Sequence, residues 1–423
     1  MKRSIKVSLF AFVLCGSLHA TDITTLLEAI EKQPNVKLDA LSIQRSELAL
    51  DKIKDNLMPK LDGFLGYERY NRPSSMRPVL PSEMKDPHAT LPFSKGITRA
   101  GINFSWPLFV KSLFTLKEKA TLMHLASKDK TRLNILQKEA AVVGLVAQLN
   151  YLHDLIMALD AKERSIFATR EKIDLMVKSG RTPQSKLMTL DAKINDLKMQ
   201  ILSVKTRKNS LRAKLEKLTD IAVDTWVKLN KKADIKEGEI FALSPLNKTL
   251  KASKLGIKAA KERYYPTVAL KGNYTYSQAD AYNNDKDVDT DFANAGLFLN
   301  LPIYDASRDT SLQEAKLDYM QNRLKIEDTK QTIMTRAKEL YQEISLLEES
   351  LKLSSKNIKN QKALLHIAKV SVENEVITQE EYLRYEDALA EAKATHAKTV
   401  ANIWQDRAEL AVIYGNDLKE IVK

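Results

Sequence analysis

Trp106-Pro107-Leu108-Phe109 and Leu301-Pro302-Ile303-Tyr304 are the two short stretches that decide the fold. Each ends a segment of alternating apolar and polar residues and opens a much longer stretch without proline. The chain runs 75 residues from Pro107 to Thr182, and 76 residues from Pro302 to Thr378. Matched spacing over that distance predicts a duplicated unit, because each copy must repeat the same order of elements.

Two further prolines mark where the alternating segments begin. Pro59 precedes the first of them and Pro266 the corresponding segment of the second copy, so four prolines are expected strand boundaries: Pro59, Pro107, Pro266 and Pro302. The paired prolines lie 48 residues apart in the first copy and 36 in the second. Length differences between repeats usually fall in surface loops.

The stretches 110–178 and 305–372 predict two very long helices. Both are rich in Leu, Ala, Lys, Glu and Gln, which favour helix. A helix of ~70 residues would reach ~105 Å, far beyond a globular domain. Apolar residues recur every three or four positions, which buries one stripe against partner helices. An ordinary helical bundle is the alternative, but helices of this length are normally coiled coils or repeats.

Each long helix is expected to stop at a turn and restart. Gly180 suits a helix C-cap, Thr182 an N-cap and Pro183 the first helical position. In the second copy Thr378 is the expected N-cap, and Glu381 completes a capping box. These signals predict returning helices at 184–218 and 380–414. Helices 22–56 and 246–264 are expected before the two hairpins.

The alternating segments predict two β-hairpins, at about 60–107 and 267–302. Strands of about ten residues with one apolar and one polar face fit a membrane β-barrel, and they also fit a half-buried soluble sheet. Four strands cannot close a barrel, because the smallest membrane barrels have ~8 strands. Two copies would give a tight eight-stranded barrel, whereas three would give twelve strands and room for a lumen.

The chain is therefore divided into a signal peptide at 1–20, a first repeat at 21–218, a connector at 219–245 and a second repeat at 246–423. The signal has a basic start, an apolar core and a cleavage site after Ala20. Lipidation of Cys15 is the alternative, which the large Leu14 before it disfavours. Cleavage leaves a mature chain without cysteine, and hence without disulfides.

Composition and motifs argue against several other functions. The net charge of +13 includes +3 from the signal, and Lys and Glu alternate along the helices as on a solvated face, so nucleic acid is not an expected partner. The histidines are not spaced as metal pairs, and no catalytic constellation or phosphate loop is present. The acidic loop 280–291 lacks the glycine and closing glutamate of a calcium loop. No enzyme activity, cofactor or metal site is expected.

In this order, twice over, the prolines, strand exits and helix restarts resemble the TolC-type outer-membrane efflux proteins, across essentially all of residues 22–420. The resemblance implies an α+β membrane protein: a coiled-coil α-barrel of long helices and four transmembrane strands per chain in a shared trimeric 12-stranded β-barrel. It implies a homotrimer in the Gram-negative outer membrane that extends into the periplasm. It also implies passive export of substrates from an inner-membrane pump (RND, ABC or MFS type) through a periplasmic adaptor.

The resemblance places the functional residues at the two helix-restart turns. The adaptor-docking turns would be Gly180, Arg181 and Thr182, with Val376, Ile377 and Thr378. The periplasmic entrance would carry the carboxylates Glu373, Glu375, Glu380 and Glu381. Arg384 stands where some members have a second carboxylate. A ring of carboxylates around a narrow pore would attract cations, although Glu380 and Glu381 also simply complement a helix N-terminus.

One alternative from another class remains at this point. A soluble periplasmic coiled-coil scaffold or adhesin would use the same long helices, and its hairpins would form a water-facing sheet. The two readings differ in whether detergent is needed to extract the protein. The exported cargo is open between drugs, metal cations and proteins.

Overall fold

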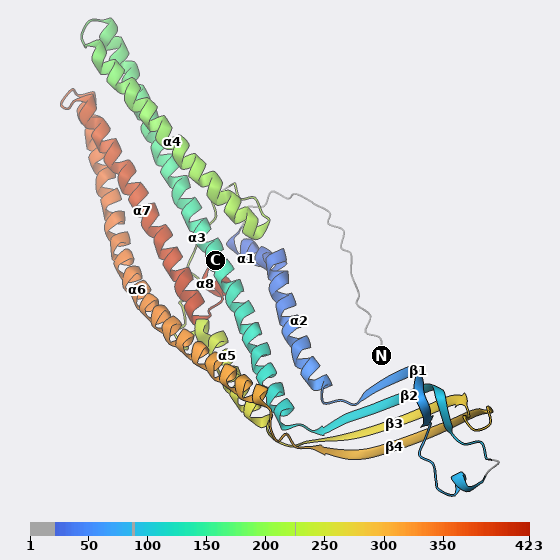
Figure 1. Ribbon diagram of the computed structural model, residues 1–423. Helices are drawn as coiled ribbons and strands as arrows, with labels where there is room; N and C mark the ends of the chain where they lie inside the picture. Colours follow the sequence, from blue (N-terminus) through green and yellow to red (C-terminus); the bar gives the residue numbers. More distant parts are fainter. Residues whose placement is uncertain (1–21, 87–88, 225) are drawn as a thin grey trace. The chain divides into compact units, whose positions relative to one another are not determined.

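The computed structural model describes residues 22–86, 89–224 and 226–423 (Figure 1). The expected signal peptide and Cys15 lie outside the described residues. The chain divides into two compact units. Unit 1 comprises Met1–Lys37, Leu133–Ala242 and Met334–Lys423, and unit 2 comprises Leu38–Arg132 and Leu243–Ile333. Each unit therefore draws on both halves of the sequence.

Unit 2 contains a four-stranded antiparallel sheet in chain order, β1-β2-β3-β4. The strands are β1 (Lys60–Ser75), β2 (Phe93–Phe109), β3 (Thr267–Asp280) and β4 (Asp287–Asn300). Within this chain β1 and β4 are therefore edge strands. The β1–β2 loop carries a short 3-10 helix, η1 (Glu83–Lys85).

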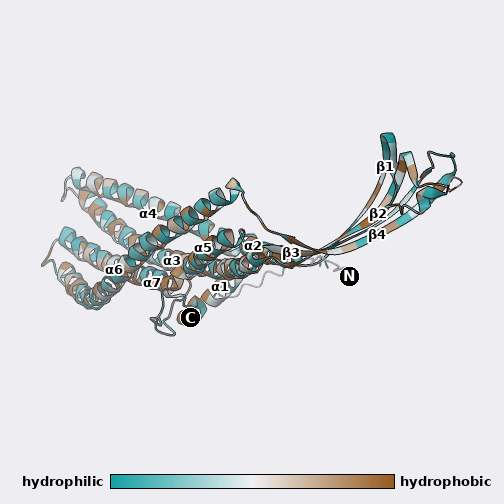
Figure 2. Cartoon of the chain, turned by 60° about the horizontal axis from the view of Figure 1, so that its bottom comes forward, coloured by the Kyte–Doolittle hydropathy of each residue, from teal (hydrophilic) through white to brown (hydrophobic). Residues whose placement is uncertain are grey.

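The alternation along the strands produces two chemically different faces. On the apolar face Leu65 is 79% exposed, and Leu297 and Leu299 are each 69% exposed. The opposite face is mainly polar, and its Asn273 Nδ2 donates to Asn103 Oδ1 at 2.7 Å across β2 and β3. Brown and teal residues alternate along the strands in Figure 2. A sheet that exposes its apolar face to the surroundings fits lipid better than water.

Helices α2 (Pro34–Asp55) and α5 (Ser244–Glu262) lead into β1 and β3. Helix α3 (Lys111–Lys178) follows β2, and its first turns are joined to α5 by polar contacts. Thr115 donates to the buried carboxylate of Glu262, and Asp129 accepts from both Ser244 and Lys248. Trp106 also donates from Nε1 to the carbonyl of Leu57, at 3.2 Å.

Unit 1 is built from long helices around a core. Its elements include α1 (Ile23–Lys32), α4 (Gln184–Thr219), α6 (Ala306–Glu373), α7 (Gln379–Tyr414) and α8 (Leu418–Ile421). α3 contains a stretch apolar enough to cross a membrane, by length and composition only. Val142, Val143 and Val146 of α3 are 0 to 1% exposed in this core, so packing accounts for apolar residues here.

The connector between the repeats is held in unit 1 by backbone hydrogen bonds. Asn230 and Lys423 exchange two of them, at 2.7 and 2.9 Å, and Lys232 N donates to Ile421 O at 2.8 Å. The side chain of Asn150 on α3 bonds both the N–H and the carbonyl of Val227. After α4 ends at Thr219, the described residues of the connector form no helix before η2 (Phe241–Leu243).

The fold class is confirmed, because long helices and four strands make up the chain. Two details differ from the sequence prediction. The helix expected at 22–56 is divided into α1 and α2, because Gln33 is extended (ψ 145°) before Pro34. The strand β2 runs two residues past Pro107, with a register shift between Pro107 and Phe109 that accommodates the missing N–H.

Candidate functional site

The turn between α3 and α4 is closed by backbone hydrogen bonds around Gly180. Gly180 is left-handed (φ 72°), and Arg181 N donates to Met176 O at 2.9 Å, which ends the helix as expected. The expected cap is displaced by one residue, since Pro183 rather than Thr182 occupies the N-cap position and α4 begins at Gln184. The cap has no side-chain hydrogen bond. Gly180 and Arg181 are exposed.

The turn between α6 and α7 has the capping box that the sequence predicts. Thr378 Oγ1 accepts from Glu381 N at 3.2 Å, and Glu381 Oε2 accepts from Thr378 N at 2.9 Å. The backbone hydrogen bond from Thr378 is the largest cause that lowers the pKa of Glu381. The cap therefore stabilises the ionised form of Glu381.

Glu375 occupies the left-handed position of the second turn. Its φ is 58°, and the next residue, Val376, donates from N to Ser371 O at 2.8 Å. Gly180 has this role in the first turn, so the two turns close in the same way with different residues. A side chain in this conformation is strained, because its Cβ approaches the following carbonyl.

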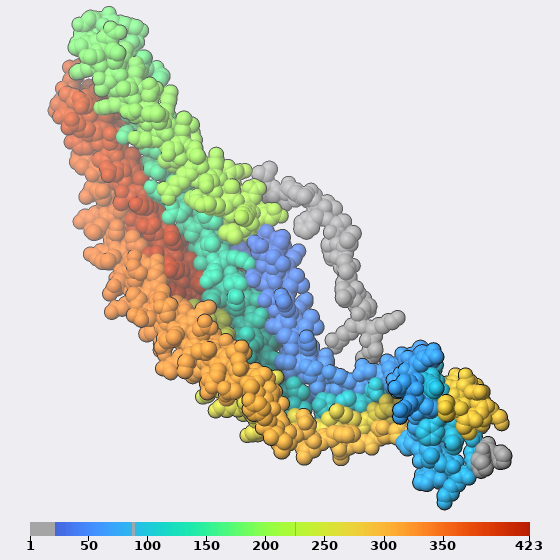
Figure 3. Space-filling view, viewed as in Figure 1, coloured from blue at the N-terminus to red at the C-terminus, as the bar shows by residue number. Residues whose placement is uncertain are grey.

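The other expected carboxylates lie on the surface of the same turn. Glu373 ends α6, and Glu373, Glu375 and Glu380 are exposed. Glu380 lies 3.5 Å from Arg384, so one basic group offsets part of the negative charge. Val376 is 75% exposed. Both turns are visible at the surface in Figure 3, in light green for α3–α4 and in red for α6–α7.

The beginning of α7 is linked to α3 by a hydrogen bond and an ion pair that were not predicted from the sequence. Gln379 Nε2 donates to Thr169 Oγ1 at 2.9 Å, and Lys162 Nζ lies 3.0 Å from Asp387 Oδ1. Leu383 is 7% exposed and packs in the core that α3 and α4 share. Residues this far apart in sequence carry no local signal of contact, so the sequence could not reveal these links.

A half-buried carboxyl group lies one turn farther along α7. Tyr382 donates its hydroxyl to Glu386 Oε1 at 3.0 Å. Burial raises the pKa of Glu386, and neighbouring Asp387 raises it further. Burial also raises the pKa of Tyr382 to about 12, so Tyr382 remains a donor. This pair places a weakened acid beside the turn.

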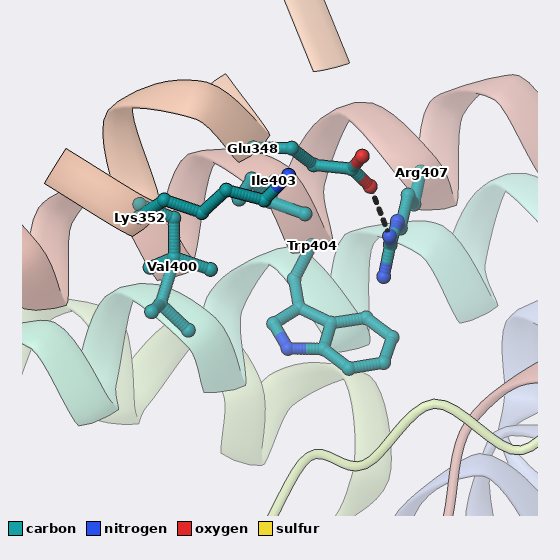
Figure 4. Close-up of a pocket in the computed structure, with 7 residues that line it drawn as sticks. Glu348, Lys352, Val400, Ile403, Trp404 and Arg407 are labelled. Carbon is teal, nitrogen blue, oxygen red and sulfur yellow. Dashed lines mark hydrogen bonds and ion pairs between the residues drawn. The ribbon is translucent and has the colours of Figure 1, made fainter. Parts of the chain in front are cut away.

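The cavity between α6 and α7 contains a paired arginine and glutamate. Its volume is about 310 Å³ (Figure 4), and Arg407 Nη2 bonds Glu348 Oε1 at 2.6 Å. The Arg407 guanidinium also lies 5.9 Å from the centroid of the Trp404 ring. Within the described residues, no group of three or more His, Cys, Asp or Glu side chains is placed to hold a metal.

Comparison with known proteins finds a family match for part of the chain and a shared fold for nearly all of it. Residues 242–416 match the family described as "Outer membrane efflux protein". The fold of nearly the whole chain matches solved channels that are described below. Over residues 242–416 the chain is similar to outer membrane efflux proteins. The resemblance drawn from the sequence is therefore supported by sequence in residues 242–416 and by fold in nearly the whole chain.

Several solved structures share the fold of this chain at low sequence identity. The Campylobacter jejuni CmeC outer membrane channel is 14% identical, with a TM-score of 0.76 over 94% of this chain and 85% of that chain. The Neisseria gonorrhoeae MtrE outer membrane channel, in its open state, is 16% identical, with a TM-score of 0.74 over 94% and 90%. The Vibrio cholerae outer membrane protein VceC is 12% identical, with a TM-score of 0.74 over 93% and 95%. No curated protein matches the chain.

Proposed function

We propose that three copies of this chain form one continuous outer-membrane channel and periplasmic duct, which conducts substrates passively. The edges of the sheet carry this proposal. β1 and β4 are unpaired at their outer sides within the chain, and the apolar face between them is exposed. In lipid each unsatisfied backbone group would cost several kcal/mol, so the edges need partners. Three copies supply twelve strands and close the sheet around a lumen.

Unit 1 offers a second pair of edges. Its long helices lie in the order α4, α3, α7, α6: Arg170 on α3 bonds Asp191 on α4, Lys162 on α3 pairs with Asp387 on α7, and Arg336 on α6 bonds Glu409 on α7. Both outer helices expose apolar side chains at heptad-like spacing. They are Met188, Met199 and Leu202 on α4, and Leu346, Leu353, Leu364 and Ile367 on α6. Pairing α4 of one copy with α6 of the next would bury both stripes.

The turns at Gly180, Arg181 and Thr182 and at Val376, Ile377 and Thr378 are the proposed docking surface for the periplasmic adaptor. They are the ends of both helix pairs, and Val376 offers an exposed apolar contact. The carboxylates Glu373, Glu375, Glu380 and Glu381 are the proposed entrance. In a trimer they would concentrate negative charge around the opening and favour cations over anions.

The mass of the protein particle extracted in mild detergent tests the shared barrel. Three chains per particle, after subtraction of detergent, support it. A monomer, or protein that is recovered from the periplasm without detergent, would overturn the duct in favour of a soluble scaffold.

Adaptor docking has its own test. The double variant Thr182→Asp, Thr378→Asp should stop co-purification of the adaptor and abolish export, while the trimer remains. A matched control is the pair Thr206→Asp, Thr310→Asp, which changes exposed threonines outside both turns. Unchanged export in the turn variant would show that the docking surface lies elsewhere.

A further inference from the structure

The polar face of β3 is buried at one end of the sheet. The strands of a single sheet do not cover its faces, so another segment must lie on this one. Thr275, Ser277, Ala279 and Ala281 alternate along this face and are 9, 1, 9 and 0% exposed. Tyr276, which points to the apolar face between them, is 40% exposed. A membrane barrel exposes its apolar face to lipid and its polar face to water, so the second face must be covered by another part of the chain.

The segment that covers this face is the far end of the β1–β2 hairpin, called the ribbon below, where β1 ends and β2 begins. The pairing of β1 with β2 shifts register between Arg69 and Ser74, and beyond this irregularity the ribbon turns across β3 and β4 (Figure 1). Met76 is 3% exposed and packs with Ile97, Ala279, Tyr70 and Val288. Ile97 and Ala279 alternate in register with Arg99 and Ser277, which places this small apolar cluster on the polar face.

Arg99, on the polar face of β2, holds the end of the ribbon by hydrogen bonds to its backbone. Its Nη2 donates to Ser75 O at 3.2 Å and its Nη1 to Met76 O at 3.3 Å. Its Nε bonds Glu68 Oε2 at 3.1 Å, so one guanidinium joins the middle of β1 to the residues at which β1 ends. A planar guanidinium can make these bonds together, whereas an ammonium cannot.

The turn between β3 and β4 forms hydrogen bonds with the residues that lead into β2. Asn283 Nδ2 donates to Ala89 O at 3.0 Å, and Tyr282 N donates to Phe93 O at 2.8 Å. The ammonium of Lys95 lies 5.3 Å from the centroid of the Tyr282 ring. Both strands of the ribbon are therefore held against the β3–β4 hairpin.

We propose that this ribbon end, the outer flap (residues 75–86 and 89–94), folds into the lumen and narrows the extracellular mouth of the channel. The inference rests on the proposed function, which makes the polar face the lumen wall. Helices α2 and α5 lead into β1 and β3, and they join these strands at the ends that are farthest from the flap. In the proposed channel the flap therefore lies on the side of the sheet away from the periplasm. Three copies would bring three flaps to one opening, which would exclude bulky solutes from outside.

A single cysteine on the lumen wall reports whether the flap closes the mouth. The mature sequence has no cysteine, so Lys271→Cys, on the polar face and closer to the periplasm than the flap, provides a unique label site. Intact cells are treated with a small maleimide and with a maleimide on a long polyethylene glycol chain. With the flap intact, we expect the polymer reagent to react roughly tenfold more slowly than the small one, which corresponds to ~1.4 kcal/mol of barrier.

Two variants release the flap by different means. Arg99→Met removes the guanidinium bonds, and Met76→Asp places a carboxylate in the apolar cluster. Both should raise the rate of polymer labelling toward that of the small reagent, while the control Arg72→Met, which changes an exposed arginine of the neighbouring strand β1, should not. The mass of the particle that each variant forms shows whether the variant has folded and assembled. If one variant fails to assemble, the comparison of the two reagents on Lys271→Cys with an unchanged flap still tests the proposal.

The outcomes separate the two proposals. Equal labelling by both reagents with an intact flap would overturn the flap and leave the duct standing. No labelling by either reagent, in any variant that has reached the outer membrane, would instead overturn the assignment of the polar face to a lumen.

Discussion

Arg336 on α6 and Glu409 on α7 form a bidentate ion pair, in which Nε and Nη2 each lie 2.8 Å from a carboxylate oxygen. Nη1 of the same guanidinium also bonds Glu339 and Glu343. The hydrogen bonds that Arg336 donates to Glu409 are the largest cause that raises the pKa of Arg336. One arginine thus balances several carboxylates between the two helices of the second repeat.

Replacing Arg336 by lysine should loosen the α6–α7 contact, because an ammonium cannot reproduce the two parallel bonds. Since the pair is partly solvated, we expect a loss of about 1 kcal/mol. Faster amide hydrogen exchange in residues 334–343 and 402–412 would measure it. The control Arg323→Lys alters an exposed pair with Glu327 and should leave exchange there unchanged. Equal effects of the two variants would rule out a special role for the bidentate geometry.

Asp406 should make the same contact sensitive to pH. Burial, followed by the charge of Glu343, raises the pKa of Asp406 from 3.8 to about 6. The folded state therefore holds this proton more tightly than the unfolded state. Its contribution is fully present below pH 3.8 and is lost as the pH rises through about 6. After allowance for solvent screening, we expect about 1 kcal/mol.

The variant Asp406→Asn should remove that dependence. Hydrogen exchange in α6 and α7, corrected for the intrinsic effect of pH, would slow between pH 7.5 and pH 5 in the parent protein by roughly fivefold, and hardly change in the variant. The same slope in both proteins would assign the effect to another group.

The two turns predict opposite responses to substitution. Glu375 is strained at φ 58°, so Glu375→Gly should stabilise its turn by about 1 kcal/mol. Gly180→Ala should destabilise the first turn by a similar amount, because its φ is 72°. Exchange in residues 371–378 and 176–183 would measure both effects. Glu375→Ala separates the loss of charge from relief of strain, and stabilisation by Ala equal to that by Gly would contradict the strain argument.

Gly415→Ala should be the most damaging of the small substitutions in unit 1. Gly415 ends α7 in the left-handed region (φ 75°), and an added Cβ would lie 2.6 Å from Cβ and Cγ of Phe241. Overlap and strain together should cost at least ~2 kcal/mol. Gly144→Ala is the matched control, since its nearest neighbour would be Gln405 Cγ at 3.9 Å. The yield and the thermal unfolding midpoint of the trimer would distinguish the two, and equal midpoints would contradict the prediction.

The sequence predicted elements well where the signal is local. Proline-free spacing predicted α3 and α6 to within one residue at their ends, and Thr378 with Glu381 predicted a cap that the structure contains. Pro34 was the local signal missed, since the chain around it was assigned to one helix. These successes rest on the backbone preferences of single residues and their close neighbours.

Long-range pairing was beyond the reach of the sequence. Alternation along the strands predicted one polar face, but it could not show that Met76 would pack on that face against Ala279, some two hundred residues later. The link from Gln379 to Thr169 is of the same kind. Such contacts depend on how helices and strands pack together, and the residue pattern of a single sequence does not indicate them.

The core of unit 1 joins Ile23 and Leu26 of α1 to Leu418, Ile421 and Val422. These residues lie almost four hundred positions apart in the sequence, so the contacts among them can form only after residue 422 has been synthesised. Contacts of such high sequence separation form slowly, because the chain must first close a loop of ~400 residues. This part of the core is therefore expected to form late in folding.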